Sequence, residues 1–365
     1  MKRYLLVAVA LLAGGALLAA QDAGNKGVPA SVMAPEIPPS VQFAGGYPGL
    51  ALQDLKGKIV LVIFFQSWCP ICNGWSSEMF KQIQEAGAGK RDVVLAAVKT
   101  DGGGVQGALS YLQGRVDPAK WLIGADPNVV WGQAAMGKDE LYLHMLVGPD
   151  GNVIERGQAG MFYTEDNNNR FVLADRIKKL LSDAKTETFL PKDKTYPDIL
   201  APIVQAAELR QYGLALRLCD AAARGAAKEA VATLKADLLQ AIDDRSKALG
   251  EVLAKADADG AARIEAFLEL KRIAANLGTS TAGKAAAKAV SAAAKDKTLA
   301  GEMQAGQEYV TLHEQAAKVK DFAKNFQFVT ALKSLAQKHP GTKFGKMAAD
   351  EAAIIEKAGR PTKSS

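Results

Sequence analysis

The feature that most constrains the fold is an apolar run that ends at a pair of cysteines. Residues 59–65 read Ile-Val-Leu-Val-Ile-Phe-Phe, which are mostly β-branched and aromatic residues without a charge. Such a run is typical of a strand that is buried on both faces. Cys69 and Cys72 follow it, and residues 73–86 carry apolar positions at helical spacing. A strand that delivers two cysteines to the start of a helix predicts thiol–disulfide chemistry.

The two cysteines have different expected roles. The thiolate is the reactive species, and a helix N-terminus lowers a thiol pKa because its free N–H groups stabilise the anion. Cys69, where the helix begins, is therefore the predicted nucleophile. Cys72, one turn further on, is placed to attack the mixed disulfide and release the substrate. Pro70 suits a first helical turn, and we expect Trp68 to cover the site. This chemistry needs no cofactor besides the redox-active disulfide.

The rest of the first half alternates between strand and helix patterns. A tight turn at Pro149–Asn152, between two β-branched segments, predicts a hairpin. The alternation indicates a central mixed sheet flanked by helices. The further expected strands are 93–98, 121–126, 141–147 and 153–156, and the further expected helices are 105–112, 129–136 and 171–181.

The chain is too long for one ordinary core. At ~150 residues per domain, its 365 residues suggest two domains. All four Trp lie within 68–131, and the composition changes near residue 183. We predict an α/β domain followed by an all-α domain. The expected limits are a signal peptide at 1–20, a Pro/Gly-rich segment at 21–49, the α/β domain at 50–183, a linker at 184–198 and the helical domain at 199–360.

The N-terminus predicts export. Lys2 and Arg3 precede an apolar run that closes with small residues at Ala19 and Ala20, as in a cleaved signal peptide. The alternative is an uncleaved anchor helix, but the run is short for a membrane span. We expect a protein of the periplasm or cell envelope that is soluble after cleavage. The formal charge is +6, yet Lys and Arg are scattered, which argues against nucleic acid as a partner.

The second half is rich in Ala, with Lys and Glu on the polar faces of expected helices. Residues 270–287 resemble residues 332–349, and each copy reads as a helix end, a turn and a second helix. This pattern predicts tetratricopeptide-like helical hairpins. Such a domain could bind a protein partner or dimerise, and the equally weighted alternative is a plain stabilising appendage.

The chain from about 50 to 183 resembles the thioredoxin superfamily, and most closely its exported TlpA-like and redoxin branch. The resemblance rests on Leu55-Lys-Gly-Lys before the apolar strand and on Trp68-Cys-Pro-Ile-Cys after it. Asp101, Asp126 and the Pro149-Asp-Gly turn support it. It implies a thioredoxin-like fold and a thiol–disulfide oxidoreductase that acts on envelope protein thiols or disulfides, reset by a membrane or soluble thiol relay. The substrate site would be lined by Trp68, Pro70, Ile71, Tyr142 and Leu143.

Two departures from the family pattern stand out. The family has a cis-proline before its third core strand, but that position falls near Tyr142, and no Pro lies between Pro127 and Pro149. The family also often has a polar residue for proton transfer below the cysteines, where this chain has Ile63. Both departures favour a specialised partner, or a metal held by the cysteine pair.

The alternative function is therefore a non-catalytic, partner-binding or copper-handling protein. His144 lies two residues past the missing proline and could join Cys69 and Cys72 as a ligand, although a lone His in a strand is more often structural. A structural zinc site needs about four ligands in paired motifs, which the chain lacks. Covalent haem needs His after the second cysteine, where Asn73 stands. We expect Cys219, in a helical segment, to be a buried inert thiol.

Overall fold

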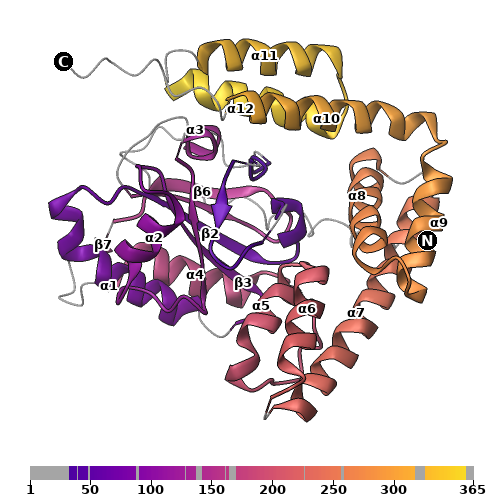
Figure 1. Ribbon diagram of the computed structural model, residues 1–365. Coiled ribbons are helices and arrows are strands. Elements are labelled where there is room, and N and C mark those ends of the chain that lie inside the picture. Colours follow the sequence, from indigo (N-terminus) through magenta and orange to yellow (C-terminus); the bar gives the residue numbers. More distant parts are fainter. Residues whose placement is uncertain are drawn as a thin grey trace, which may run out of the picture.

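The protein is described here from a computed structural model. The described residues are 33–38, 40–47, 50–87, 90–127, 129–136, 142–160, 162–163, 170–225, 227–255, 259–316 and 325–358. The predicted signal peptide lies outside them. A mixed sheet flanked by helices comes first, and helices alone follow, as predicted. In Figure 1 the later helices run along two sides of the sheet domain. Among the described residues, no helix is both long and apolar enough to cross a membrane.

The sheet has six strands in the order β1-β4-β3-β2-β5-β6. Strands β2, β3 and β4 are parallel, while β5 runs antiparallel to β2, β6 to β5 and β1 to β4. The bounds are β1 Gln42–Phe43, β2 Ile59–Phe65, β3 Val93–Lys99, β4 Trp121–Ala125, β5 Leu143–Val147 and β6 Val153–Gln158, and β7 Phe162–Tyr163 pairs separately with β8 Arg170–Phe171. The predicted hairpin is the β5–β6 pair, and Gly151 in its turn has φ +84°.

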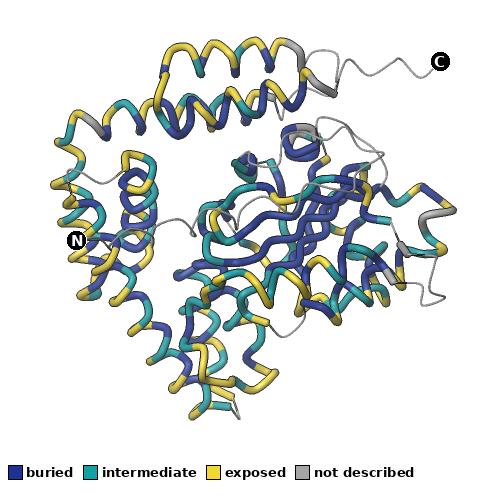
Figure 2. The backbone as a smooth tube through the Cα atoms, turned by 180° about the vertical axis from the view of Figure 1, so that it is seen from behind, coloured by how far each residue is buried: buried dark blue, intermediate teal, exposed yellow. Residues whose placement is uncertain are grey.

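The central strand β2 is buried on both faces, which confirms the prediction from its apolar run. Alternate side chains enter the two cores, with Ile59, Leu61, Ile63 and Phe65 in one and Val60, Val62 and Phe64 in the other. Figure 2 shows the strands as the most continuously buried part of the chain. Helices α1 Pro70–Gly87, α2 Gly104–Leu112 and α4 Val172–Asp183 cover the first face, and α3 Val130–Met136 covers the second.

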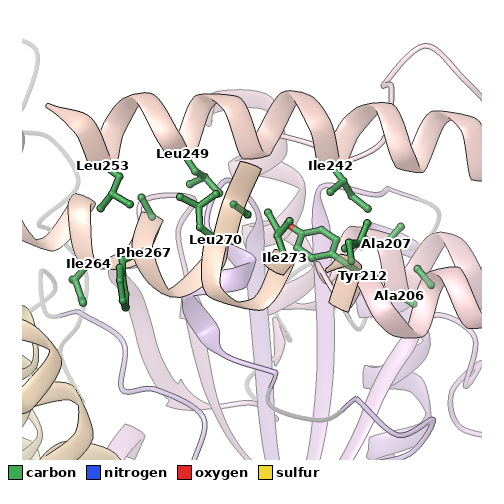
Figure 3. Close-up of a cluster of buried hydrophobic side chains, with 14 of the residues drawn as sticks. Ala206, Ala207, Tyr212, Ile242, Leu249, Leu253, Ile264, Phe267, Leu270 and Ile273 are labelled. Atoms are coloured by element: carbon green, nitrogen blue, oxygen red, sulfur yellow. The ribbon is translucent and has the colours of Figure 1, made fainter. Parts of the chain in front are cut away.

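The second domain consists of packed helices among the described residues. In Figure 3, Leu249 and Leu253 of α7 lie against Ile264, Phe267 and Leu270 of α8. The bounds are η1 Leu52–Leu55 and η2 Asp198–Leu200 for the short 3-10 helices, then α5 Ala201–Glu208, α6 Tyr212–Ala222, α7 Lys228–Ala254, α8 Gly260–Leu277, α9 Thr281–Ala293, α10 Lys297–Ala316, α11 Asn325–Lys338 and α12 Lys343–Ala358.

Two helical hairpins, α8–α9 and α11–α12, occupy the two similar stretches of sequence. Gly283 and Gly345 stand at equivalent places in them. A Cβ on Gly283 would lie 1.9 Å from the Leu277 carbonyl oxygen, and one on Gly345 would lie 2.2 Å from the His339 carbonyl oxygen. Both turns thus need glycine for the same steric reason. A tetratricopeptide-like repeat stays a prediction.

The helical domain docks on the N-terminal end of β2. Lys58 Nζ lies 2.6 Å from Glu208 Oε2, and Lys56 Nζ lies 2.7 Å from Glu265 Oε1. Asp54 accepts two hydrogen bonds from the guanidinium of Arg272. On the far side of the molecule, α12 packs against α3 (Figure 1). No local pattern in the sequence predicts these charged contacts between the domains.

Candidate functional site

Cys69 lies between the C-terminal end of β2 and the start of α1. Its carbonyl oxygen accepts a hydrogen bond from the Asn73 N–H at 3.2 Å, which places Cys69 at the N-cap of the helix. The side chain is only 6% exposed and packs in the core on the α1 side of the sheet. Cys69 is disulfide-bonded in this structure. The N-terminal N–H groups of α1 would stabilise a thiolate at this position when the disulfide is reduced.

The residues on either side of Cys69 are open to solvent. Trp68 is 64% exposed, and Pro70, the first residue of α1, is exposed as well. The side chains of Ile71 and Cys72 lie outside the described part of the structure. An exposed indole next to a largely buried sulfur gives the site an apolar surface that a partner protein can contact.

A buried charge pair holds the loop that carries Cys69. The carboxylate of Asp101 accepts hydrogen bonds from the Ser67 N–H at 3.1 Å and from the Ser67 Oγ at 2.7 Å. Lys99 Nζ lies 2.6 Å from Asp101 Oδ1, and the Lys99 side chain is 4% exposed. Burial raises the pKa of Asp101, but the hydrogen bonds from Lys99 and Ser67 outweigh it and hold that pKa below its usual range.

Tyr142 stands on the opposite wall, immediately before β5. Its backbone has φ +50°, and the described residues contain no cis peptide bond. The ring is 1% exposed and lies edge-on to Trp75, with centroids 4.8 Å apart. Its hydroxyl is hydrogen-bonded to the Tyr111 hydroxyl, which in turn donates to Asn73 Oδ1 on α1. Burial raises the pKa of Tyr142. Tyr142, paired with the half-buried Tyr111, thus stands where the resemblance would place a proline.

The other residues that the sequence named for the site are all buried. Leu143 is 1% exposed and belongs to the core on the opposite face of the sheet. His144 is buried, and its Nε2 lies 3.4 Å from Glu155 Oε1. Ile63 is fully buried in the core that also contains Cys69.

No group of three or more His, Cys, Asp or Glu that could hold a metal occurs within the described residues. The side chain of Cys72 is outside that part, so the alternative of a metal on Cys69, Cys72 and His144 stays a hypothesis.

Lys99 and Tyr111 belong to this site although they were not predicted from the sequence. Lys99 ends an apolar strand and precedes Thr100 and Asp101, and a lysine in that position is the available signal for a buried pair. Tyr111 lies on α2 with no motif around it, so only the fold brings it to Tyr142. Both residues support the Cys69 loop and helix rather than reach solvent.

No family model matches the sequence, and no curated protein does. Solved structures do match. A candidate protein disulfide isomerase from Bacteroides thetaiotaomicron is 20% identical over 43% of this chain and 92% of its own, with a TM-score of 0.35. A candidate thiol:disulfide interchange protein DsbE from Chlorobium tepidum is 20% identical over 43% and 99%, with a TM-score of 0.33. A candidate thioredoxin from Neisseria meningitidis is 23% identical over 43% and 95%, with a TM-score of 0.32. At this identity the likeness concerns the fold alone.

Proposed function

We propose that this chain, whose first domain has the thioredoxin-like fold, is an exported thiol–disulfide oxidoreductase that acts on proteins of the cell envelope. The observation that carries the proposal is the position of Cys69. It caps α1 at the end of the central buried strand, beside an exposed Trp68. A thiol there gains the stabilisation of a helix N-terminus and meets partners at an apolar surface.

The proposed reaction is a two-step exchange. In the reducing direction the Cys69 thiolate attacks one sulfur of a substrate disulfide, forms a mixed disulfide and releases the other substrate sulfur as a thiolate. The Cys72 thiolate then attacks Cys69 Sγ, which forms the Cys69–Cys72 disulfide and releases the second substrate thiolate. A thiol relay of the envelope supplies two electrons and resets the pair. The oxidising direction runs through the same steps in reverse.

The surrounding residues have supporting roles in this proposal. The Lys99–Asp101 pair fixes the loop before Cys69 through Ser67. The Tyr111–Tyr142 pair fixes the first turn of α1 through Asn73. Both arrangements keep the backbone of the site in place while the sulfur changes its oxidation state.

The test is a redox titration of the purified full chain, read by the mass of alkylated thiols. We expect reversible two-electron cycling that Cys69→Ser abolishes and that Cys219→Ser leaves unchanged, because Cys219 is a free thiol at 0% exposure. Trapping with Cys72→Ser, followed by mass spectrometry, would identify the partner held on Cys69. A pair that no reductant opens, or cycling that persists in Cys69→Ser, would contradict the proposal.

The second candidate is a binding protein in which the helical domain captures an envelope partner and the cysteine pair holds copper. The observation that favours it is Tyr142, which replaces the proline that keeps metals off the thiolates in the family. It is tested by metal analysis of the reduced chain. Stoichiometric copper that is lost in both Cys69→Ser and His144→Ala would support this candidate. If the reduced chain holds no copper, or if copper binding depends on neither residue, the copper-binding candidate is ruled out.

A further inference from the structure

A cavity of about 180 Å³ lies where the two domains meet. It is lined by residues of the turn before β2, of the segment after α4, of the α5–α6 connection and of α7. These residues are Lys56, Lys58, Glu187, Thr188, Phe189, Arg210, Ala241 and Arg245. At ~3.3 Å per residue, the seven-residue strand β2 places this cavity about 20 Å from Cys69, so it is separate from the redox site.

The lining is strongly cationic. Lys56, Lys58, Arg210 and Arg245 come from different segments of the chain and meet around one space, whereas Glu187 is the only carboxylate among the lining residues that the structure describes. Like charges brought together in a partly buried space repel one another unless acceptors lie between them.

The nearby carboxylates are shared between cations. Glu208 pairs with Lys58 at 2.6 Å and faces Arg91 at 3.6 Å. Glu269 pairs with Arg245 at 2.8 Å and with Arg210 at 3.4 Å. In each case one carboxylate pairs with two basic side chains.

The third such carboxylate is Glu265, which lies 2.7 Å from both Lys56 and Lys343. These ion pairs therefore join six cationic side chains to three carboxylates. Glu187 and Asp92, which accepts from the Thr186 hydroxyl at 2.7 Å, add two more negative charges, and Asp54–Arg272 is neutral as a pair.

Arg210 shows the shortage of acceptors most directly. Its side chain is 8% exposed, and its buried Nε has no hydrogen-bond partner among the described residues. Of its other nitrogens, one faces Glu269 at 3.4 Å and one donates to the Lys56 carbonyl oxygen at 3.1 Å. Its backbone is in the left-handed region, with φ +54°. A strained backbone and an unsatisfied buried donor commonly mark a ligand site.

Lys58 is buried, and its ammonium group is fully hydrogen-bonded. Its Nζ donates to Glu208 Oε2 at 2.6 Å, to the Arg91 carbonyl oxygen at 2.8 Å and to the Glu187 carbonyl oxygen at 3.4 Å. Lys58 therefore adds positive charge to the cavity lining but no further donor.

We propose that this cavity binds a small inorganic oxyanion of the phosphate class, which joins the two domains by accepting hydrogen bonds from both. Lys56 donates from the sheet domain, Arg210 and Arg245 donate from the helical domain, and Lys58 contributes its charge. A compact anion with acceptors on all sides suits donors that converge from several directions. At ~30 Å³ per water molecule, the volume also leaves room for water around such an ion.

The experiment is a calorimetric titration of the full chain with sodium phosphate, alongside sodium chloride at matched ionic strength. We expect one saturable site per chain for phosphate, a higher thermal midpoint in its presence and no such effect of chloride. Arg245→Gln, at a side chain that is 32% exposed, should weaken phosphate binding by roughly tenfold or more. The matched control is Lys235→Gln, also on α7, whose exposed pair with Asp220 lies outside the cavity lining and should not matter.

Equal effects of phosphate and chloride would overturn the proposal, and so would full affinity in Arg245→Gln. If Arg245→Gln does not fold, as judged by circular dichroism, the wild-type comparison of the two salts decides alone. Cys69→Ser should bind phosphate like the wild type. The outcome of the phosphate titration therefore does not depend on whether the proposed redox function is correct.

Discussion

Tyr142 combines a left-handed backbone with a fully buried aromatic ring. A non-glycine residue in that conformation costs of order 1 kcal/mol or more. The ring lies 4.8 Å from Trp75 and 6.1 Å from Phe65, centroid to centroid, and burying an aromatic ring stabilises by several times that amount. Packing therefore outweighs the strain and holds the turn before β5 without a proline.

Replacing Tyr142 separates these contributions. Tyr142→Phe keeps the ring and loses only the hydroxyl with its hydrogen bonds to Tyr111 and Ser76, so we expect a loss of about 1–2 kcal/mol in the free energy of unfolding. Tyr142→Pro loses the ring and cannot adopt φ +50°, since proline is fixed near −65°, and should lose ~4 kcal/mol or more. Urea denaturation measures both. Equal stability of the two variants would show that the family's proline fits here after all.

Asp101 and Lys99 offer a test of charge at the site. Asp101→Asn keeps an oxygen that accepts from the Ser67 N–H but leaves the buried Lys99 ammonium without its counter-charge. The thiolate of Cys69 is then favoured, and we expect its pKa to fall by about 0.5–1 unit. The measurement is the pH dependence of Cys69 alkylation in a Cys72→Ser background.

The control for that measurement is Asp117→Asn, since Asp117 makes an exposed pair with Lys120 at 3.3 Å. It should leave the alkylation profile unchanged. An identical profile for Asp101→Asn would mean that the pair has only a positioning role.

At the scale of elements, the two helical hairpins depend on how closely one helix start approaches the preceding helix end. Ser280 caps α9 by accepting from the Gly283 N–H at 3.0 Å, and this brings Gly283 against the Leu277 carbonyl. The neighbour is backbone, which cannot move aside as a side chain can.

Gly283→Ala should therefore destabilise the protein by ~2 kcal/mol or more, because a Cβ would lie 1.9 Å from the Leu277 oxygen. Gly301→Ala in α10 is the matched control. Nothing lies within 4 Å of its added Cβ, so helix propensity alone should stabilise it by about 0.5–1 kcal/mol. Denaturation midpoints of the two variants on either side of the wild type would confirm this account, whereas two equal midpoints would contradict it.

The sequence predicted the elements well where a local pattern determines them. The β2–α1 unit and the β5–β6 hairpin follow from an apolar run and a turn motif that lie within a few residues. The backbone conformation of Tyr142 could not be predicted, because it depends on packing against the rings of Phe65 and Trp75, which are distant in sequence. Cys72 and Ile71 stay predictions, since their side chains lie outside the described residues.

At the scale of the whole molecule, the contact between the domains rests on charges that the sequence presents as a polar face. Glu265, Glu269 and Arg272 recur at helical spacing on α8, as on a solvated face. In the structure Glu265 and Arg272 face Lys56 and Asp54 of the sheet domain. Glu269 pairs with Arg210 of its own domain, and Arg210 donates to the Lys56 carbonyl oxygen across the interface. No local pattern distinguishes a face that meets water from one that meets another domain, so this interface could not be predicted.

Glu269, which holds Arg210 against the interface, should make the stability of the protein sensitive to acid. Burial raises its pKa, but hydrogen bonds and charge from Arg245 and Arg210 outweigh burial and lower it to about 2. Its folded pKa lies below the unfolded value of ~4.3, so its contribution is present above pH ~4.3 and is lost as the pH falls towards 2. The amount is ~3 kcal/mol.

The check is the free energy of unfolding of wild type and Glu269→Gln at pH 5 and pH 2.5. Wild type should lose more stability than the variant over this interval, because the glutamine cannot be protonated. Equal losses of stability in wild type and variant would show that Glu269 does not contribute to the acid sensitivity.

The segment before the sheet domain has a consequence for the order of events during folding. Tyr47 donates a hydrogen bond to Gln205, Trp131 donates to the Pro35 carbonyl, and Lys343 lies 3.5 Å from Gln53, so early residues contact partners up to 290 positions later. Such contacts form slowly because long loops must close first. These early residues are made long before their partners, and we expect the amide hydrogens around them to gain full protection from exchange only after those later segments have docked.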